Sequence, residues 1–171
     1  NSLRNRGNEA EAEALLIQVR QTIGSSANRE IRARLEVAFG YLYCQQGKYD
    51  KAIKSAERVD QLYPGRGNRR HQGAALGIRA LALASGKGDY AAAEQLAAEA
   101  VGLLSEQGNQ YDLLATLIDL SLWQDAQGKF RETNRTRDLV LELARKIGAP
   151  LPLSVALGNR AMGAHQLGDY E

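Results

Sequence analysis

The sequence predicts an all-α protein built from stacked, antiparallel helix hairpins, and three observations carry this prediction. Ala (26 residues) and Leu (24 residues) dominate the 171 residues, whereas Val and Ile together number only 13, a bias that favours helix over sheet. The three prolines, Pro64, Pro150 and Pro152, leave long stretches of chain without a helix breaker. A motif of glycine, a polar residue and an aromatic ring recurs about every forty residues, which indicates a repeat architecture.

This motif divides the chain at regular intervals. It occurs at Gly47-Lys48-Tyr49, Gly88-Asp89-Tyr90, Gly128-Lys129-Phe130 and Gly168-Asp169-Tyr170, with the glycines spaced 41, 40 and 40 residues apart. A second series of glycines, each 20 residues after one of the first, consists of Gly67, Gly108 and Gly148. Each repeat therefore has two halves that end at a glycine. Glycine suits a helix C-terminus because it enters the left-handed region of backbone space at little cost.

Each half of a repeat is predicted to be one helix. In chain order, we expect helices at 8–23, 29–46, 49–63, 69–87, 90–106, 111–127, 130–147 and 152–167. In the fifth of these, Leu96, Ala100 and Leu103 recur at spacings of four and three, the period of a helix, and the leucines of the sixth do much the same. All three prolines fall between expected helices, as their missing N–H requires.

Short loops between helices of similar length make neighbouring helices antiparallel. One hairpin cannot cover both of its apolar faces, so successive hairpins stack side by side. We therefore expect a single solenoid over residues 1–171. Its units are a partial repeat at 1–27, three repeats at 28–67, 68–108 and 109–148, and a partial repeat at 149–171.

The last expected helix, at 152–167, has no following partner helix. It would expose Leu153, Leu157, Ala161 and Ala164 to water. Terminal repeats of a solenoid need a polar outer face. We therefore expect either self-association through the C-terminal end or a longer protein that continues with more repeats.

The residues around the first motif resemble a tetratricopeptide repeat (TPR). The matching pattern is Phe39-Gly40-x-x-Tyr43-x-x-x-Gly47-x-Tyr49-x-x-Ala52, followed by Pro64 after the second helix. The third unit keeps Gly88, Tyr90 and Ala93, whereas the fourth has Thr133 where the alanine belongs. The step of about 40 residues is longer than the usual 34. It is similar to the long-helix variants in kinesin light chains and in the sensor arms of bacterial signalling proteins, including transcription activators and some with a diguanylate cyclase output. The alternative is an unrelated helical bundle with coincidental glycines.

The resemblance implies a right-handed superhelix of about eight helices. It implies that Gly40 lets the paired helices approach, that Tyr43 and Tyr49 fill the space between them, and that Ala52 packs at their closest crossing. The first helix of each hairpin would line a concave groove that receives peptide segments. Matching positions predict partner contacts at Arg34, Tyr41, Gln45, Asp119, Asp125, Asn159 and His165, with Val37, Ile78, Leu122 and Met162 as apolar neighbours. Any one of these residues could instead pack between repeats.

One subclass of the family does not fit. TPR domains that clamp a C-terminal carboxylate use Lys and Asn on the groove face of their first repeat. This chain offers Val37, Ala38 and Tyr41 at the matching positions of its first complete hairpin. The resemblance therefore does not extend to a clamp for chaperone tails.

A basic cluster is the second candidate binding surface. Arg66, Arg69 and Arg70 lie together, with His71 beside them and Arg79 two turns on. Such a cluster could contact an acidic partner or a phosphate backbone. The alternative is a solvated loop and helix start. Positive charges do not favour a helix N-terminus, so helix stability does not explain the cluster.

The sequence lacks the patterns of common catalytic and cofactor sites. It has no phosphate-binding loop. The only histidines, His71 and His165, lie far apart, and each is expected to be an ordinary surface or groove residue. The single cysteine, Cys44, excludes an intrachain disulfide and is expected to be a small buried or groove-edge residue. We expect no enzymatic activity, no cofactor and no metal.

Composition excludes further classes of protein. The net charge of +2, with 25% charged residues, argues against an acidic disordered tail and against a strongly basic nucleic-acid binder, so nucleic acid is not an expected partner. No apolar run approaches the roughly 20 residues needed to cross a bilayer, and no signal peptide is visible. The leading hypothesis is a protein–protein interaction scaffold within a larger, bacterial, cytoplasmic signalling or regulatory protein. The alternative is a ligand-sensing module that controls an attached effector by changing the pitch of the solenoid.

Overall fold

The computed structural model describes residues 2–24, 28–65, 67–107 and 110–148, which form seven α-helices and no strand. In chain order the helices are α1 (Ser2–Ile23), α2 (Arg29–Gln45), α3 (Tyr49–Leu62), α4 (Arg69–Lys87), α5 (Tyr90–Gln107), α6 (Gln110–Ala126) and α7 (Phe130–Ile147). The prediction of an all-α fold is confirmed. The expected helix at 152–167, and with it the apolar surface predicted there, lies outside the described residues.

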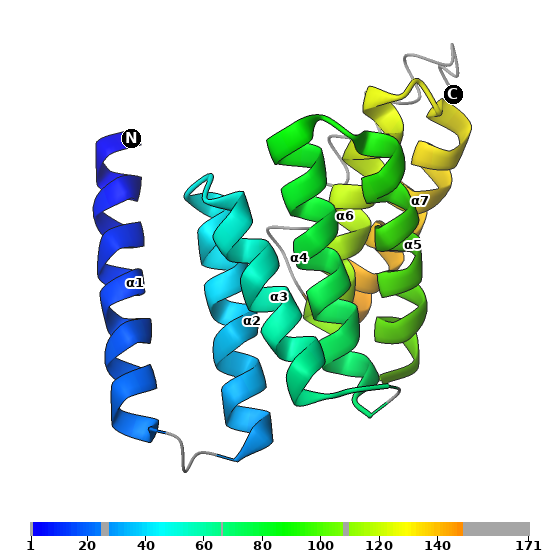
Figure 1. Cartoon of the computed structure of the whole chain (residues 1–171). Coiled ribbons are helices and arrows are strands. Elements are labelled where there is room, and N and C mark those ends of the chain that lie inside the picture. The colour runs from blue at the N-terminus through cyan, green and yellow to red at the C-terminus, as the bar shows by residue number, and fades with distance from the viewer. Residues whose placement is uncertain (1, 25–27, 66, 108–109, 149–171) are drawn as a thin grey trace.

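The helices stack side by side in chain order. Figure 1 shows α1 at one end, followed by the hairpins α2–α3, α4–α5 and α6–α7. Each helix contacts the next one in the chain, α2 also contacts α4, and α4 also contacts α6. Since α2, α4 and α6 are the first helices of successive hairpins, these contacts place all three along the same side of the stack.

Helix boundaries from α2 to α7 agree with the sequence prediction to within one residue. The exception is α1, which begins at Ser2 and continues through Gly7, where the sequence predicted a start at residue 8. A glycine inside a helix costs only about 1 kcal/mol relative to Ala, so it does not by itself end a helix.

Asparagines at equivalent positions of two repeats cap the N-termini of α2 and α4, the first helices of their hairpins. Asn28 precedes α2, and its side-chain oxygen accepts a hydrogen bond from the Ile31 N–H at 2.9 Å. Asn68 precedes α4 and accepts in the same way from the His71 N–H at 3.2 Å. Each cap satisfies one of the N–H groups that a helix start leaves without a partner.

Glycines end the helices largely as predicted. Gly88 follows α4 and Gly148 follows α7, both in the left-handed region with φ of 67° and 66°. The turn between α3 and α4 is different, because its left-handed glycine is Gly65, with φ of 72°, and Gly67 is not in that region. Pro64 before Gly65 explains the difference, since proline followed by glycine is the pair that a type II turn favours.

Small residues sit where helices cross. Ala52 and Ala93 have no exposed surface, as expected for alanines at closely packed crossings. A Cβ atom at Gly40 would lie 2.5 Å from Cδ1 of Ile78. Ile78 belongs to α4, so the expectation that Gly40 serves the pairing within its own hairpin needs correction. It serves the approach of α2 to the first helix of the next hairpin.

Thr133 occupies the alanine position of the last described hairpin. It has no exposed surface, and its hydroxyl donates to the Lys129 carbonyl at 2.9 Å. This bond satisfies the buried hydroxyl within α7 itself. The position is therefore packed in this hairpin too, with a threonine in place of the alanine.

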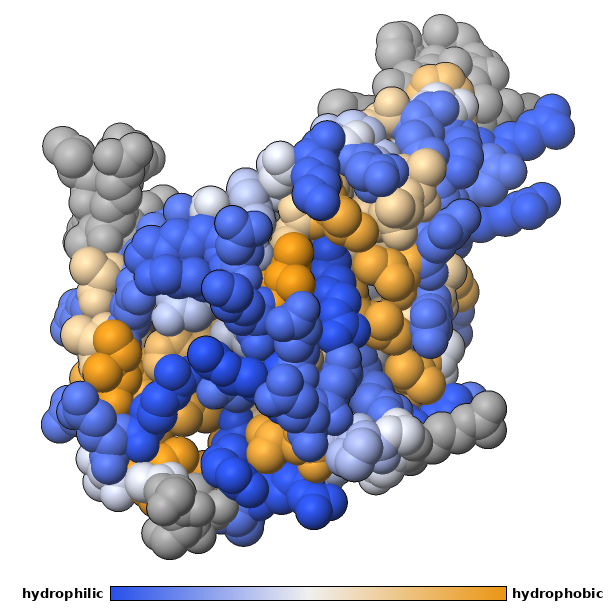
Figure 2. Space-filling view, viewed as in Figure 1, coloured by the Kyte–Doolittle hydropathy of each residue, from blue (hydrophilic) through white to orange (hydrophobic). Residues whose placement is uncertain are grey.

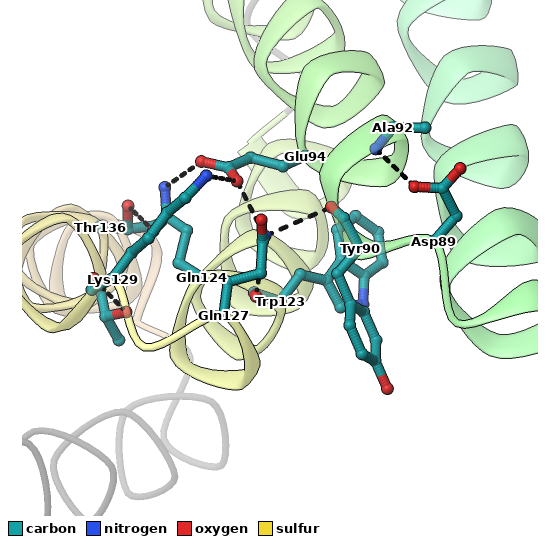
Figure 3. Close-up of polar contacts among 10 residues, drawn as sticks. Asp89, Tyr90, Ala92, Glu94, Trp123, Gln124, Gln127, Lys129 and Thr136 are labelled. Carbon is teal, nitrogen blue, oxygen red and sulfur yellow. Dashed lines mark hydrogen bonds and ion pairs between the residues drawn. The ribbon is translucent and has the colours of Figure 1, made fainter.

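A carboxylate on α5 joins that helix to the turn between α6 and α7 (Figure 3). Glu94 accepts hydrogen bonds from Lys129 Nζ at 2.6 Å and from Gln127 Nε2 at 2.9 Å. The same contact occurs 81 residues earlier, where Glu13 on α1 accepts from Lys48 Nζ at 2.9 Å. The repeat thus extends to the polar contacts that link one unit to the next.

Between these two contacts along the stack lies a third junction, at which the acidic and basic residues have exchanged places. Lys54 and Asp89 occupy the equivalent positions, 41 residues after Glu13 and Lys48. No ion pair joins Lys54 to Asp89, although the structure describes both residues. Asp89 instead accepts a hydrogen bond from the Ala92 N–H at 3.1 Å, also drawn in Figure 3.

The first helix is partly or fully exposed to solvent from residue 8 to residue 23. No residue of α1 from 8 to 23 is fully buried, and Leu15, Ile17 and Val19 are 55%, 42% and 44% exposed. Figure 2 shows apolar surface on α1. The apolar side chains of α1 are therefore available for contact.

Candidate partner-binding surface

The first helices of the three hairpins, α2, α4 and α6, bring polar side chains together around Gly77, which has no side chain. A Cβ atom at Gly77 of α4 would lie 3.4 Å from the Tyr41 hydroxyl oxygen of α2 and 3.6 Å from Thr116 Oγ1 of α6. Because Gly77 leaves this space free, Tyr41 reaches across α4 toward α6. We call the surface formed by Tyr41, Gly77, Thr116 and Asp119 the central face.

Asp119 contributes a half-buried carboxylate to the central face. It lies one turn after Thr116 on α6, and burial raises the pKa of Asp119 to about 6. Its carboxylate makes no hydrogen bond or ion pair with the described part of the chain. Burial together with the charge of Asp119 raises the pKa of the Cys44 thiol on α2 to about 12.

Asp112, one turn before Thr116, has a different environment. Burial raises the pKa of Asp112, whereas the nearby positive charges of Arg70 and His71 act in the opposite direction. Burial, followed by the charges of Asp112 and Asp119, raises the pKa of the Tyr41 hydroxyl above its usual value. Both carboxylates therefore act on the pKa of Tyr41, and among the described residues Arg70 and His71 act on the pKa of Asp112 but not on that of Asp119.

An apolar groove adjoins the central face. It lies between α1 and α2 and has a volume of about 380 Å³. The lining residues are Ala12, Leu15, Leu16, Val19, Ala38, Tyr41, Leu42 and Gln45. Tyr41 belongs both to the groove and to the central face, so the two form one continuous surface. A partner could bury apolar groups in the groove and place polar groups at the central face.

The sequence-predicted contact residues fall into three groups. Tyr41 and Gln45 line the apolar groove, and Asp119 belongs to the central face. Arg34 is exposed and forms an ion pair with Glu30 at 2.8 Å within α2. Asn159 and His165, with Met162, lie outside the described residues.

Two other predicted contacts are engaged inside the fold. Asp125 pairs at 3.4 Å with Arg137, a side chain of α7 that is only 3% exposed. Ile78 has no exposed surface and packs against Gly40. Of the remaining apolar neighbours, Val37 is half-buried and Leu122 is 46% exposed.

The basic cluster is largely neutralised by acidic neighbours. Arg69 pairs with Glu106 on α5 at 2.8 Å, and Arg79 forms an ion pair with Asp60 on α3. Arg70 is half-buried near Asp112, and Arg66 lies outside the described residues. Arg69 and Arg79 therefore connect α4 to its neighbouring helices. These connections explain why the arginines occur there, which the stability of the α4 helix alone does not explain.

His71 is a buried connection between two first helices. Its side chain is 4% exposed, and Nε2 lies 2.8 Å from Glu30 Oε2 on α2. The Tyr63 hydroxyl donates to the same carboxylate oxygen at 3.2 Å. The hydrogen bond with His71 is the main reason why the pKa of Glu30 falls to about 2. The expectation of a surface or groove histidine is thus replaced by a structural role.

A separate cleft of about 520 Å³ lies among α3, α4 and α5. Its polar lining comprises Asp60, Arg69, Gln72, Arg79 and Glu99, and Leu76 and Leu103 add apolar surface. Charges of both signs therefore face the cleft, which spans two hairpins.

Other chemistry is sparse in the part of the chain that the structure describes. Cys44 is buried, and its raised pKa keeps the thiol protonated at neutral pH. Over the described ranges, no three side chains of His, Cys, Asp or Glu gather as a metal site requires. None of the described helices is long and apolar enough to cross a lipid bilayer.

Sequence reasoning did not single out Gly77, Thr116 or Asp112. Thr116 and Asp112 precede Asp119 by three and seven residues, the helical period that puts side chains on one face. This spacing was a usable signal. The role of Gly77 had none, because it depends on how far Tyr41 reaches from a different helix.

Comparison with solved structures finds similar folds, including the two that follow. The apo form of RapI matches with a TM-score of 0.75 and 12% sequence identity, over 97% of this chain and 60% of that one. BtubC (BKLC) from P. vanneervenii matches with a TM-score of 0.74 and 15% identity, over 98% of this chain and 69% of that one. The fold is a helical-repeat solenoid. At such low identity the likeness shows the fold alone, and the chain spans only 60% of the length of RapI.

Comparison with protein-family models and with curated proteins gives no match.

Proposed function

We propose that this chain is a TPR-type scaffold that binds a peptide or helix of a partner protein along the apolar groove and the central face. The observation that carries the proposal is the position of Tyr41. Its ring lines an apolar groove, and its hydroxyl lies over Gly77 of α4, on the side of that glycine where Thr116 of α6 also lies. Amphipathic rings of this kind often anchor protein–protein contacts.

The shape and polarity of the surface support a protein segment as the ligand. Leu15 and Val19 remain 55% and 44% exposed beside Tyr41, so a partner that covers them removes apolar area from water. An amphipathic helix that lies in such a groove uses apolar anchors on one face and polar groups beside them. The helical-repeat fold supports the same conclusion, because solenoids present extended binding surfaces.

We place this scaffold within a larger bacterial signalling or regulatory protein of the cytoplasm. The support is the resemblance of the repeat to long-helix TPR variants.

Selection from a random-peptide display library tests the proposed function. Peptides selected on the whole chain are measured against Tyr41→Ala and Leu15→Ala variants by fluorescence polarisation. The matched control is Leu139→Ala on α7, because Leu139 is 51% exposed and Leu15 is 55% exposed. We expect a weakening of about tenfold for the first two variants and little change for the control. Peptides that bind Tyr41→Ala and Leu15→Ala as tightly as the wild type would contradict the proposal.

The cleft among α3, α4 and α5 supports a second candidate, a ligand-sensing module. A small zwitterion could contact Arg69 and Glu99 across two hairpins and so change the angle between them. Thermal-shift screening of amino acids, followed by small-angle scattering, tests this candidate. It requires a ligand whose effect is lost in Arg69→Ala and that changes the radius of gyration. A bound ligand that leaves the dimensions unchanged argues against sensing.

A further inference from the structure

A further cavity, among α1, α2 and α3, is surrounded by an excess of positive charge. It has a volume of about 270 Å³. Its charged lining consists of Arg20, Arg32, Arg58 and Glu36, and Ile23 and Leu62 add apolar surface. These side chains bring a net charge of +2 to the cavity. We call this cavity the arginine cleft.

The charges of the arginine cleft are only partly neutralised. Among the described residues that line it, only Glu36 is acidic, and two arginines share its carboxylate. Arg20 Nη2 lies 2.9 Å from Glu36 Oε1, whereas Arg58 Nη1 lies 3.4 Å from Oε2, longer than a usual N–H···O hydrogen bond. Arg32 is exposed, and its guanidinium has no hydrogen bond or ion pair with the described part of the chain. Arg32 and Arg58 therefore retain N–H donors for a ligand.

The next repeat shows that helix packing does not require these arginines. The cleft among α3, α4 and α5 has Gln72 where the arginine cleft has Arg32, and Glu99 where it has Arg58. The offsets are 40 and 41 residues, the same offsets that separate the starts of α2 and α4 and of α3 and α5. In that second cleft the charged side chains balance to zero.

A third cleft, among α5, α6 and α7, carries the comparison further. Leu113 and Leu139 occupy the two arginine positions there. The apolar position of Leu62, by contrast, remains leucine in all three clefts, as Leu103 and Leu143. Positions that are basic, polar or acidic, and apolar in equivalent places are not fixed by the fold. The two arginines therefore need an explanation other than packing.

We propose that the arginine cleft binds a small organic anion. Its carboxylate or phosphate group contacts Arg32 and Arg58, and its apolar part lies against Ile23 and Leu62. The volume of about 270 Å³ is slightly below the roughly 300 Å³ at which pockets for drug-sized molecules begin, so the ligand is small.

The chemistry of the lining fits such a ligand. A guanidinium presents its N–H donors as a planar fork that matches the oxygens of a carboxylate or phosphate, and charge-assisted hydrogen bonds of this kind are strong. Arg20 is held in place by Glu36 and lies over the Phe39 ring, 4.0 Å from its centroid, so it adds a fixed positive charge beside the site. The net charge of +2 disfavours cationic ligands.

Isothermal titration calorimetry on the whole chain tests the proposal. The probes are isovalerate, isopentyl phosphate, neutral isovaleramide and inorganic phosphate, which separate the anionic group from the apolar part. We expect isovalerate or isopentyl phosphate to bind at one site per chain, and the tighter of the two identifies the preferred anionic group. Isovaleramide should not bind.

Variants of the arginines locate the site. Arg32→Gln and Arg58→Gln should each weaken binding by about tenfold. Arg32→Gln introduces the residue that the next repeat has at the equivalent position, and a circular dichroism melt confirms that each variant is folded. The charge-matched control is Arg135→Gln, because Arg135 is exposed on α7 and does not line the arginine cleft. It should bind as the wild type does.

Three results would overturn the proposal. The first is the absence of saturable binding of either organic anion at millimolar concentrations. The second is binding that Arg32→Gln and Arg58→Gln leave unchanged, or that Arg135→Gln weakens equally. The third is inorganic phosphate that binds as tightly as isopentyl phosphate, because Ile23 and Leu62 would then contribute nothing. The described residues that line the arginine cleft do not include any that line the apolar groove, so these results leave the proposed scaffold function standing.

Discussion

The hydroxyl of Tyr41 lies over Gly77, so that a methyl group at that glycine would be 3.4 Å from the hydroxyl oxygen. The two residues are on different first helices, α2 and α4, and the contact brings Tyr41 within reach of α6. This relationship converts two separate helix faces into one surface. It also distinguishes Gly77 from Gly40, where a Cβ atom would be only 2.5 Å from Ile78.

Alanine substitution should have opposite effects on protein stability at these two glycines. Gly77→Ala should stabilise the protein by up to about 1 kcal/mol, because alanine favours helix and the contact with Tyr41 is of ordinary length. Gly40→Ala should destabilise it by roughly 1–3 kcal/mol through overpacking against Ile78. Gly102 is the control and should gain the full helix-propensity benefit, because a Cβ atom there would have no neighbouring atom within 4 Å. Urea denaturation measures all three, and a stabilising Gly40→Ala would refute the packing described for α2 and α4.

The buried alanines offer a second packing test. Ala52→Leu and Ala93→Leu should each lower the free energy of unfolding by roughly 1–3 kcal/mol, because both alanines have no exposed surface. A leucine at Ala91, an exposed residue of α5, should be tolerated. Neutral substitutions at Ala52 and Ala93 in urea melts would mean that these residues do not sit at helix crossings.

Asp119→Asn should make the protein more stable at neutral pH. Burial raises the pKa of Asp119 from 3.8 to about 6, so the folded state binds more protons than the unfolded state between these values. Stability is therefore lost as pH rises through this window, and the loss persists above it. Since asparagine carries no charge, the variant should gain on the order of 1–3 kcal/mol at pH 7. The gain should vanish below about pH 3.8. Denaturation at both pH values checks this, and a gain independent of pH would contradict the assigned cause.

Three lysine variants test how much the contacts between units contribute to the free energy of unfolding. Lys129→Met and Lys48→Met remove the cations from Glu94 and Glu13, and each should cost about 0.5–1 kcal/mol because the pairs are partly exposed. Lys54→Met at the intermediate junction should cost little, since Lys54 forms no ion pair with the described residues.

The acid dependence of this cost has a definite sign. Burial alone would raise the pKa of Glu94, but the hydrogen bonds from Lys129, Gln127 and Gln124 outweigh burial and hold that pKa below 4.5. The stabilisation is therefore full above about pH 4.5 and is lost as pH falls through the lowered pKa. Equal unfolding energies for Lys129→Met and Lys54→Met at pH 7 would show that the junction contact contributes nothing.

The helices were predictable because their signals are local. Glycine and proline punctuation and the helical period set the ends of α2 to α7 to within one residue. The resemblance to TPR repeats also implied that Tyr41 and Asp119 contact a partner, a role that stays a prediction. The contact of His71 with Glu30 was not predictable, because the two residues are 41 positions apart and meet only through the packing of α2 on α4. The reach of Tyr41 over Gly77 was missed for the same reason.

The location of a bound peptide tests the central claim most directly. A crystal structure of the chain with its tightest-binding selected peptide should show the peptide in the groove between α1 and α2, in contact with Leu15 and Tyr41. A peptide seated instead in the cleft beside Asp60 and Arg79, or on the outer surface of α7, would contradict the assignment of the partner-binding surface.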